Sequence, residues 1–232
     1  MTIHACNAPN IACWSGPRNL STAMMYSFSQ VTTVVDEPFY AAFLRSTGLD
    51  HPMRKEILES QPSDPAKVVE GLPKAPHYLK LMTHHHLPET PIDWAHSYKH
   101  VFLIRHPARV LASYLAKRES PTFEDIGFQH QADLFDRLGG VVIDSADIRA
   151  DPPLMLRRLC DAIELDYDPA MLKWPAGGNA ADGVWAAHWY GAVHRSTGFA
   201  GTEGPLPQLE HPVLDQAMPF YEKLTRHRLM PC

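Results

Sequence analysis

Residues 11–22 read Ile-Ala-Cys-Trp-Ser-Gly-Pro-Arg-Asn-Leu-Ser-Thr, and this stretch decides the fold. Its apolar start predicts a buried strand, which leads into a tight Gly-Pro turn. The turn leads into a helical pattern that places Leu20, Met24 and Phe28 on one face. A strand, a short loop and a helix N-terminus in this order can hold a phosphate, because loop N–H groups and the helix dipole both supply positive potential. The stretch therefore predicts a phosphate-binding loop.

The side chains of this loop indicate which kind of ligand it binds. Arg18 supplies a fixed positive charge, and Ser21 and Thr22 supply hydroxyl donors. The Gly-Lys pair that precedes Ser or Thr in a Walker loop is absent. We therefore expect the chain to bind a phosphate-like group without being an ordinary ATPase.

A second stretch, residues 101–113, predicts another anion contact. It reads Val-Phe-Leu-Ile-Arg-His-Pro-Ala-Arg-Val-Leu-Ala-Ser, a buried strand followed by a helix. Arg105 directly follows the strand, at the end where open α/β sheets bind ligands. Ser113 lies six residues beyond Pro107, about 9 Å along the helix axis. Arg105 and Ser113 would thus hold an anion beside the helix, unless Arg105 caps a neighbouring helix and Ser113 faces solvent. We expect Arg109 on a solvated face, with a phosphate contact as the alternative.

The composition limits the class of protein. The 232 residues are 45% hydrophobic, enough for a substantial core, and we expect a single α/β domain over residues 1–232. The net charge of −5 gives no sign of bulk nucleic-acid binding. Cys6, Cys13, Cys160 and Cys232 show no paired spacing and predict reduced thiols in a cytoplasmic protein. The chain has no leader pattern and no run near the roughly 18 apolar residues of a membrane span, so we expect neither secretion nor a membrane helix.

Short apolar runs alternate with helical patterns along the chain. This order predicts a P-loop-type three-layer α/β fold, with a central, mostly parallel sheet and helices on both faces. We expect residues 50–76 to form a helical insertion, and residues 174–208 to form an irregular lid or substrate segment. The predicted strands are residues 10–14, 32–35, 78–82, 101–104 and 141–143. The predicted helices are residues 19–29, 107–117, 128–138, 153–164 and 209–224.

Together the two anion-binding stretches resemble the sulfotransferase superfamily, whose members use 3′-phosphoadenosine 5′-phosphosulfate (PAPS) as sulfuryl donor. The first loop of the family is typically Pro-Lys/Arg-Ser-Gly-Thr/Ser-Thr, and residues 17–22 resemble it. Its second element is Arg-x-Pro with a later Ser, to which Arg105 and Ser113 correspond. Residues 144–160 look like an architectural Glu-Asp-Leu…Asp-Pro segment of the family. The likeness covers most of residues 10–165.

The pattern also looks like a bacterial sulfotransferase-like subfamily, and a related domain is found fused to aminotransferase-like proteins in plants. Two features depart from the superfamily pattern. Leu20 stands where the loop usually has Gly, so the backbone there must accept a Cβ. The late Arg-Lys-Gly and Gly-x-x-Gly-x-x-Lys element is absent. Residues 194–198 are its nearest stand-in, with Arg195 as a candidate donor contact.

The resemblance implies a set of donor contacts. Arg105 and Ser113 would hold the 3′-phosphate, and Arg18 would stabilise the bridging oxygen as it leaves. Sulfuryl transfer is an in-line displacement, as phosphoryl transfer is, but the group carries less negative charge. We therefore expect side-chain cations and N–H dipoles to suffice without a metal ion. The loop that would grip the 5′-phosphosulfate consists of Pro17, Arg18, Asn19, Leu20, Ser21 and Thr22.

An acceptor hydroxyl needs a general base, and two residues compete for this role. Glu37 resembles the Glu of the Glu-Pro-x-Trp/Tyr motif in carbohydrate-type sulfotransferases, or else it is an acid favoured at a helix start. His84 follows Thr83 and resembles the base of the Lys-Thr-His-x-Pro motif in cytosolic small-molecule sulfotransferases. The alternative for residues 84–86 is a polar loop in which two of the three His are partly exposed. A zinc site would need further ligands, which the spacing does not offer.

The sequence therefore predicts an enzyme that transfers a sulfuryl group from PAPS to a hydroxyl or amine of a small molecule. The acceptor and the oligomeric state stay open, and no nucleic-acid partner is expected. Two other functions remain: a nucleotide kinase or NTPase with a degenerate loop, and a non-catalytic nucleotide-binding module. Four late aromatic residues could stack adenine or line an acceptor pocket, with core packing expected for at least half of them. They are Trp185, Trp189, Tyr190 and Phe199.

Overall fold

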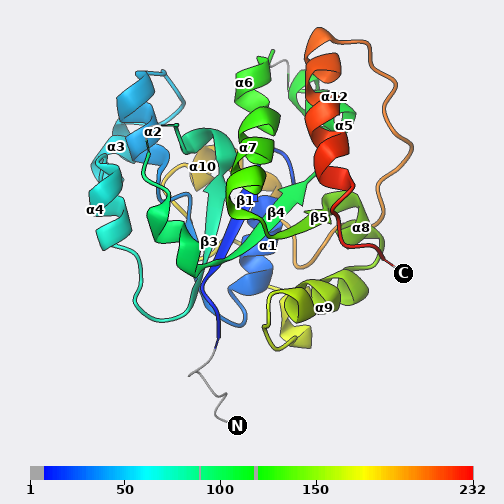
Figure 1. Cartoon of the computed structure of the whole chain (residues 1–232), viewed down its shortest axis with the longest axis horizontal. Helices are drawn as coiled ribbons and strands as arrows, with labels where there is room; N and C mark the ends of the chain where they lie inside the picture. The colour runs from blue at the N-terminus through cyan, green and yellow to red at the C-terminus, as the bar shows by residue number, and fades with distance from the viewer. Residues whose placement is uncertain (1–7, 89, 118–119, 232) are drawn as a thin grey trace.

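The structure, a computed structural model, describes residues 8–88, 90–117 and 120–231. Five parallel strands form one sheet in the order β2-β3-β1-β4-β5, with β1 at its centre (Figure 1). The expected three-layer α/β fold is therefore confirmed, and each predicted strand is present. The strands are β1 (Ile11–Ser15), β2 (Thr33–Asp36), β3 (His77–Met82), β4 (Lys99–Ile104) and β5 (Val141–Asp144).

Helices connect the strands and cover the sheet. Between β1 and β4 the helices are α1 (Ser21–Phe28), α2 (Tyr40–Thr47), α3 (Arg54–Ser60), α4 (Pro65–Glu70) and the 3₁₀ helices η1 (Thr83–His85) and η2 (Asp93–Ser97). After β4 follow α5 (Pro107–Leu115), α6 (Phe123–Ile126) and α7 (Phe128–Leu138). After β5 the helices are α8 (Ser145–Ala150), α9 (Pro152–Ala162), η3 (Pro169–Leu172), α10 (Ala186–Trp189), α11 (Gly191–His194) and α12 (Pro212–Thr225).

The sheet is covered on both faces, which explains why its strands are apolar without alternation. Every residue of β1 and of β3 is buried. Successive residues of β1 belong to opposite cores. Ile11 and Cys13 share a core with α1 and α9, whereas Ala12 and Trp14 share one with α7 and α12. Two hydrophobic layers therefore fix the position of the central strand.

The carboxyl ends of the parallel strands place several loops at one edge of the sheet. Residues 16–20 follow β1, Glu37 follows β2, η1 follows β3 and Arg105 follows β4. The strand order reverses at β1, which lies between β3 and β4. Ligands of open α/β sheets bind at such a point, because the connections diverge there and leave a crevice.

Two segments add to this framework. Residues 50–76 contain α3 and α4, and residues 174–208 contain the short helices α10 and α11 within long irregular stretches. In Figure 1, α3 and α4 lie on the side of the molecule opposite α12.

The cysteines of the core are isolated thiols. Cys13 and Cys160 are free and buried, and burial raises the pKa of each thiol to about 12. Cys6 and Cys232 lie outside the described residues. Within the described ranges, no helix combines the length and the apolar character that crossing a membrane requires.

Candidate active site

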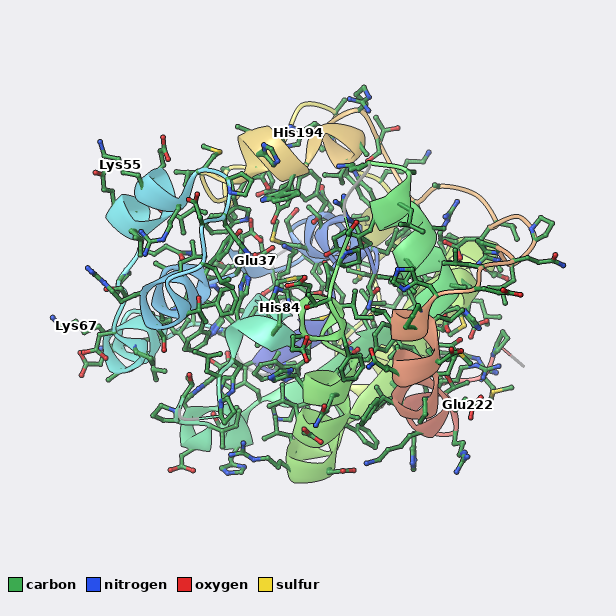
Figure 2. All side chains as sticks on the ribbon, turned by 90° about the horizontal axis from the view of Figure 1, so that it is seen from above. Glu37, Lys55, Lys67, His84, His194 and Glu222 are labelled. Atoms are coloured by element: carbon green, nitrogen blue, oxygen red, sulfur yellow. The ribbon has the colours of Figure 1, made fainter. Side chains whose placement is uncertain are left out.

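A cavity of about 570 Å³ opens at the carboxyl edge of the sheet. Its lining includes the whole first loop, residues 17–22, together with Glu37 and His84. Figure 2 shows Glu37 and His84 near the middle of the molecule, whereas Lys55 and Glu222 lie at its periphery. The predicted donor loop and both candidate bases therefore share one cavity.

The first loop has an unusual backbone that neighbouring side chains hold in place. Arg18 and Leu20 adopt left-handed conformations, with φ of 62° and 74°, a region that disfavours a Cβ. Asn19 Nδ2 donates to the carbonyl of Leu103 (3.3 Å), and Arg105 Nη1 donates to the carbonyl of Arg18 (2.7 Å). The backbone at Leu20 thus carries a side chain in a conformation that Gly would adopt without strain.

Helix α1 starts at this loop, and its first turn lines the cavity. Leu20, the residue before the helix, offers no side-chain cap to the first-turn N–H groups. Ser21, Thr22 and Ala23 all belong to the cavity lining. Because first-turn N–H groups have no partner inside a helix, this N-terminus and the two hydroxyls can bind an anion.

The Arg18 side chain lies against two aromatic rings of the cavity. Its guanidinium carbon is 4.9 Å from the ring centre of Tyr114 and 5.6 Å from that of Trp189. Such cation–π contacts orient a guanidinium and leave its charge in place. Of the late aromatic residues, Trp189 and Tyr190 line the cavity, whereas Trp185 and Phe199 pack against the core.

Glu37 belongs to a buried cluster of charged groups beside the cavity. The strand register pairs Asp36 with Lys80, whose Nζ lies 3.0 Å from Asp36 Oδ1. The same ammonium contacts Glu37 Oε1 and lies 2.6 Å from the hydroxyl of Tyr190. This hydroxyl is also 2.8 Å from each oxygen of Asp36 and accepts from Trp185 Nε1 at 3.0 Å. The side chains of Asp36 and Lys80 are each only 1% exposed.

Two carboxyl groups share one ammonium in this cluster, so its charges do not balance. Burial raises the pKa of Glu37; Lys80 offsets part of that rise, and the charge of Asp36 adds to it. Burial opposes the charge on Lys80, but Asp36 and Glu37 together raise its pKa, so Lys80 stays protonated at neutral pH. A carboxylate with a raised pKa is a stronger base, which suits Glu37 for general base catalysis.

The sequence contains a signal for this cluster outside the anion-binding motifs. Lys80 interrupts an otherwise apolar strand, and a Lys in a strand buried on both faces needs a buried acid. Asp36 ends the neighbouring strand β2 and Glu37 follows it, and both carboxylates meet that need. The hydroxyl of Tyr190 comes from a residue 110 positions away from Lys80, which no local pattern predicts.

Two of the three consecutive His after β3 are buried and only His84 is partly exposed, so the alternative with two partly exposed His is wrong. His85 and His86 are 5% and 4% exposed. The ring of His85 stacks on Tyr40 and Phe43, with centroid distances of 4.3 Å and 4.7 Å. Neutral imidazole packs as an aromatic ring does, and burial lowers the pKa of both His residues.

His84 and His85 both line the cavity, and the predicted alternative base is His84. Burial lowers its pKa to about 3, and the charges of His51 and His130 add to the shift. The imidazole is therefore neutral at neutral pH but a weaker base than Glu37. Its Nδ1 atom has no hydrogen-bond partner among the described residues. In the part of the chain that the structure describes, no three His, Cys, Asp or Glu side chains are grouped to hold a metal ion.

The second anion stretch lies beside the first loop rather than in the cavity lining. Arg105 joins the two through the carbonyl of Arg18 and also pairs with Glu203, which sequence reasoning missed. A single acid in a Gly- and Pro-rich segment carries no motif that would have identified it. Ser113 is half-buried on α5 and Arg195 is exposed after α11, and neither lines the cavity. Their contacts with a donor stay predictions.

The chain is similar to known proteins over almost its whole length. A family model described as "Sulfotransferase domain" matches residues 9–228. The chain is 38% identical to branched-chain-amino-acid aminotransferase-like protein 1 of Arabidopsis thaliana and 36% identical to protein 2 of the same plant. Each alignment covers 94% of this chain, but 42% and 41% of the two plant proteins. The chain thus spans about two fifths of the length of the curated relatives it matches.

Two solved structures share the fold. The sulfotransferase domain from the curacin biosynthetic pathway has a TM-score of 0.56 at 15% identity, over 94% of this chain and 98% of that one. The sulfotransferase domain from the Synechococcus PCC 7002 olefin synthase has a TM-score of 0.53 at 17% identity, over 99% and 98%. At this identity the likeness concerns the fold alone.

Proposed function

Because the chain belongs to the sulfotransferase domain family, we propose that it transfers a sulfuryl group from PAPS to a hydroxyl or amine of a small molecule. The observation that carries this proposal is the shared lining of one cavity by the start of α1, Arg18 and Glu37. Group transfer needs an anion site and a general base that reach the same substrate. The volume of about 570 Å³ falls within the range of small-molecule sites, about 300–1,000 Å³.

The residues of the first loop fit the phosphosulfate end of PAPS. The uncapped start of α1 and the hydroxyls of Ser21 and Thr22 can donate to the 5′-phosphate. Arg105 and Ser113 would hold the 3′-phosphate, and Arg105 has a buried Nε without a hydrogen-bond partner in the described part of the chain. When bound, PAPS would supply an activated sulfuryl group with a nucleotide as leaving group.

Each site residue has a defined task in this proposal. Glu37 takes the proton of the acceptor, and Lys80 and Tyr190 orient it through Oε1, which leaves Oε2 for that proton. Arg18 stabilises the negative charge that develops on the leaving oxygen. The N–H groups of α1 and Arg18 supply the positive charge that a metal ion supplies in many phosphoryl transferases. His84 is the alternative base.

Product formation tests the proposal. Purified protein is incubated with PAPS and a panel of small phenols, alcohols and amines, and mass spectrometry follows the sulfated product and adenosine 3′,5′-bisphosphate. We expect product with at least one acceptor and a rate that falls by two orders of magnitude or more in Arg18→Ala. Nucleotide binding without any transfer would favour the non-catalytic module. Magnesium-dependent phosphoryl transfer from ATP would favour the kinase.

A further inference from the structure

Three arginine side chains converge on one glutamate beside the first loop. Glu203 lies in the irregular segment between α11 and α12, and its side chain is only 4% exposed. Arg105 Nη2 pairs with Glu203 Oε1, and Arg149 Nη1 lies 2.9 Å from the same oxygen. Arg109 Nε lies 2.8 Å from Oε2. The arginines come from the end of β4, from α5 and from α8, so three elements build this cluster.

The arginine cluster can accept more negative charge than Glu203 supplies. Three guanidinium groups face one carboxylate, and no other carboxylate of the described residues pairs with them. The buried Nε of Arg105 is an unused donor within the described chain. A phosphate monoester carries a charge of about −1.5 to −2 and three acceptor oxygens, whereas a carboxylate has one charge and two oxygens. Phosphate therefore matches the three guanidinium groups better than Glu203 does.

The segment that carries Glu203 is fastened by the same arginines. Arg149 Nε donates to the carbonyl of Gly201 (2.9 Å), and Arg109 Nη2 donates to the carbonyl of Gly204 (2.6 Å). Among the described residues, no backbone–backbone hydrogen bond involves residues 200–210. Figure 1 shows the segment as a long orange loop that passes outside the helices to the start of α12. If this segment moved away from the arginines, its contacts with them would break, but the hydrogen bonds of the helices and strands would stay intact.

The arginine cluster also borders the proposed donor site. Arg105 Nη1 donates to the carbonyl of Arg18 at 2.7 Å, so one guanidinium contacts both the first loop and Glu203. On α5, Ser113 follows Arg109 by four residues and lies on the same helix face. A phosphate held by the three arginines would thus lie next to the loop that lines the cavity.

We propose that Arg105, Arg109 and Arg149 form a phosphate site that Glu203 occupies as an internal competitor, and that residues 200–206 move away when a phosphate monoester enters. The inference rests on the proposed function for the identity of this phosphate, the 3′-phosphate of the donor nucleotide. The competition itself rests on the contacts of Glu203. Because Glu203 is tethered, it competes at a high effective concentration and weakens binding of phosphate to the wild-type protein.

Substitution of the competitor tests this inference. Calorimetry compares adenosine 3′,5′-bisphosphate with adenosine 5′-monophosphate on wild type, Glu203→Gln and the matched control Glu210→Gln, an exposed acid of the same segment. We expect Glu203→Gln to bind the bisphosphate about tenfold more tightly and the monophosphate nearly unchanged. Glu210→Gln should match wild type. An unchanged or weaker affinity of folded Glu203→Gln for the bisphosphate would overturn the inference.

A measurement on the wild-type chain keeps the test independent of that variant. A Glu-specific protease can cleave after Glu203 only when this side chain leaves the arginines, and cleavage after Glu210 is the internal reference. We expect inorganic phosphate to raise cleavage after Glu203 several-fold relative to Glu210. The same ratio with and without saturating phosphate would overturn the inference. Release of Glu203 by phosphate in a protein that does not bind the bisphosphate would support the site and contradict the proposed donor.

Discussion

Replacement of Glu37 by Gln should separate catalysis from stability. The variant keeps the shape of the side chain and removes one of two buried negative charges. Lys80 and Asp36 then form a balanced pair, with 3.0 Å between Nζ and Oδ1. Since burial and Asp36 both raise the pKa of Glu37, its ionised form is disfavoured in the folded state. We therefore expect the free energy of unfolding at neutral pH, measured with urea, to equal or exceed that of wild type.

The same substitution removes the proposed general base. Loss of such a group lowers kcat by about 10²–10⁴-fold, or about 2.7–5.5 kcal/mol of activation free energy. The assay follows adenosine 3′,5′-bisphosphate formed from PAPS with an acceptor from the panel. His84→Gln is the matched variant, and it should retain most of the activity. A stable Glu37→Gln protein with wild-type kcat would refute the assignment of Glu37 as base.

The pH dependence of kcat distinguishes the two candidate bases. A general base works when deprotonated, so activity is lost as the pH falls through its pKa. For Glu37 this loss should lie above its ordinary pKa of 4.5, because burial raises the value. For His84 it would lie at about 3. An acidic limb at about 3 in wild type, or its disappearance in His84→Gln, would assign the role to His84 instead.

Three further substitutions test other parts of the site. Arg18→Ala should cost about 2.7–4 kcal/mol of transition-state stabilisation in kcat/KM, by analogy with one lost oxyanion donor, and unchanged kinetics would exclude its role. Gly16→Ala would place a Cβ 2.7 Å from the carbonyl oxygen of Ile126; we expect a loss of about 1–3 kcal/mol in urea unfolding, and full stability would show that the loop can shift. Lys80→Met leaves the carboxylates of Asp36 and Glu37 without their partner ammonium. We therefore expect the free energy of unfolding at pH 7 to fall by about 3–5 kcal/mol. That loss should shrink as the pH falls and Glu37, whose pKa is raised by burial, takes up a proton, and a pH-independent loss would contradict the electrostatic explanation.

The fold was predictable because its strands are buried on both faces. The apolar run of residues 11–14, followed by a turn and a helical pattern, predicts a buried strand from local sequence alone. In the structure the same residues pack between two hydrophobic cores. The helix after Arg105 was predicted to start at Pro107, where α5 begins. Parallel pairing then brings strand ends to one edge, so the first loop and Glu37 share a cavity although 19 positions separate Arg18 from Glu37 (37 − 18).

The rest of the site depends on contacts that the sequence does not encode locally. Glu203 lies 98 positions from Arg105, and only the path of the late segment brings them together. Burial of His85 and His86 was missed because a run of His suggests polarity, whereas the neutral imidazole of His85 packs as an aromatic ring between Tyr40 and Phe43. Tertiary packing, rather than any motif, decides the protonation state of such groups.

Calorimetry with adenosine 3′,5′-bisphosphate tests the central claim most directly, that the first loop and the arginine cluster bind the two ends of one nucleotide. We predict saturable binding of one nucleotide per chain, weakened about tenfold or more by Arg18→Ala and by Arg105→Ala, since each removes a charged contact. Absence of binding by the wild-type protein, or tighter binding of magnesium ATP, would contradict the claim.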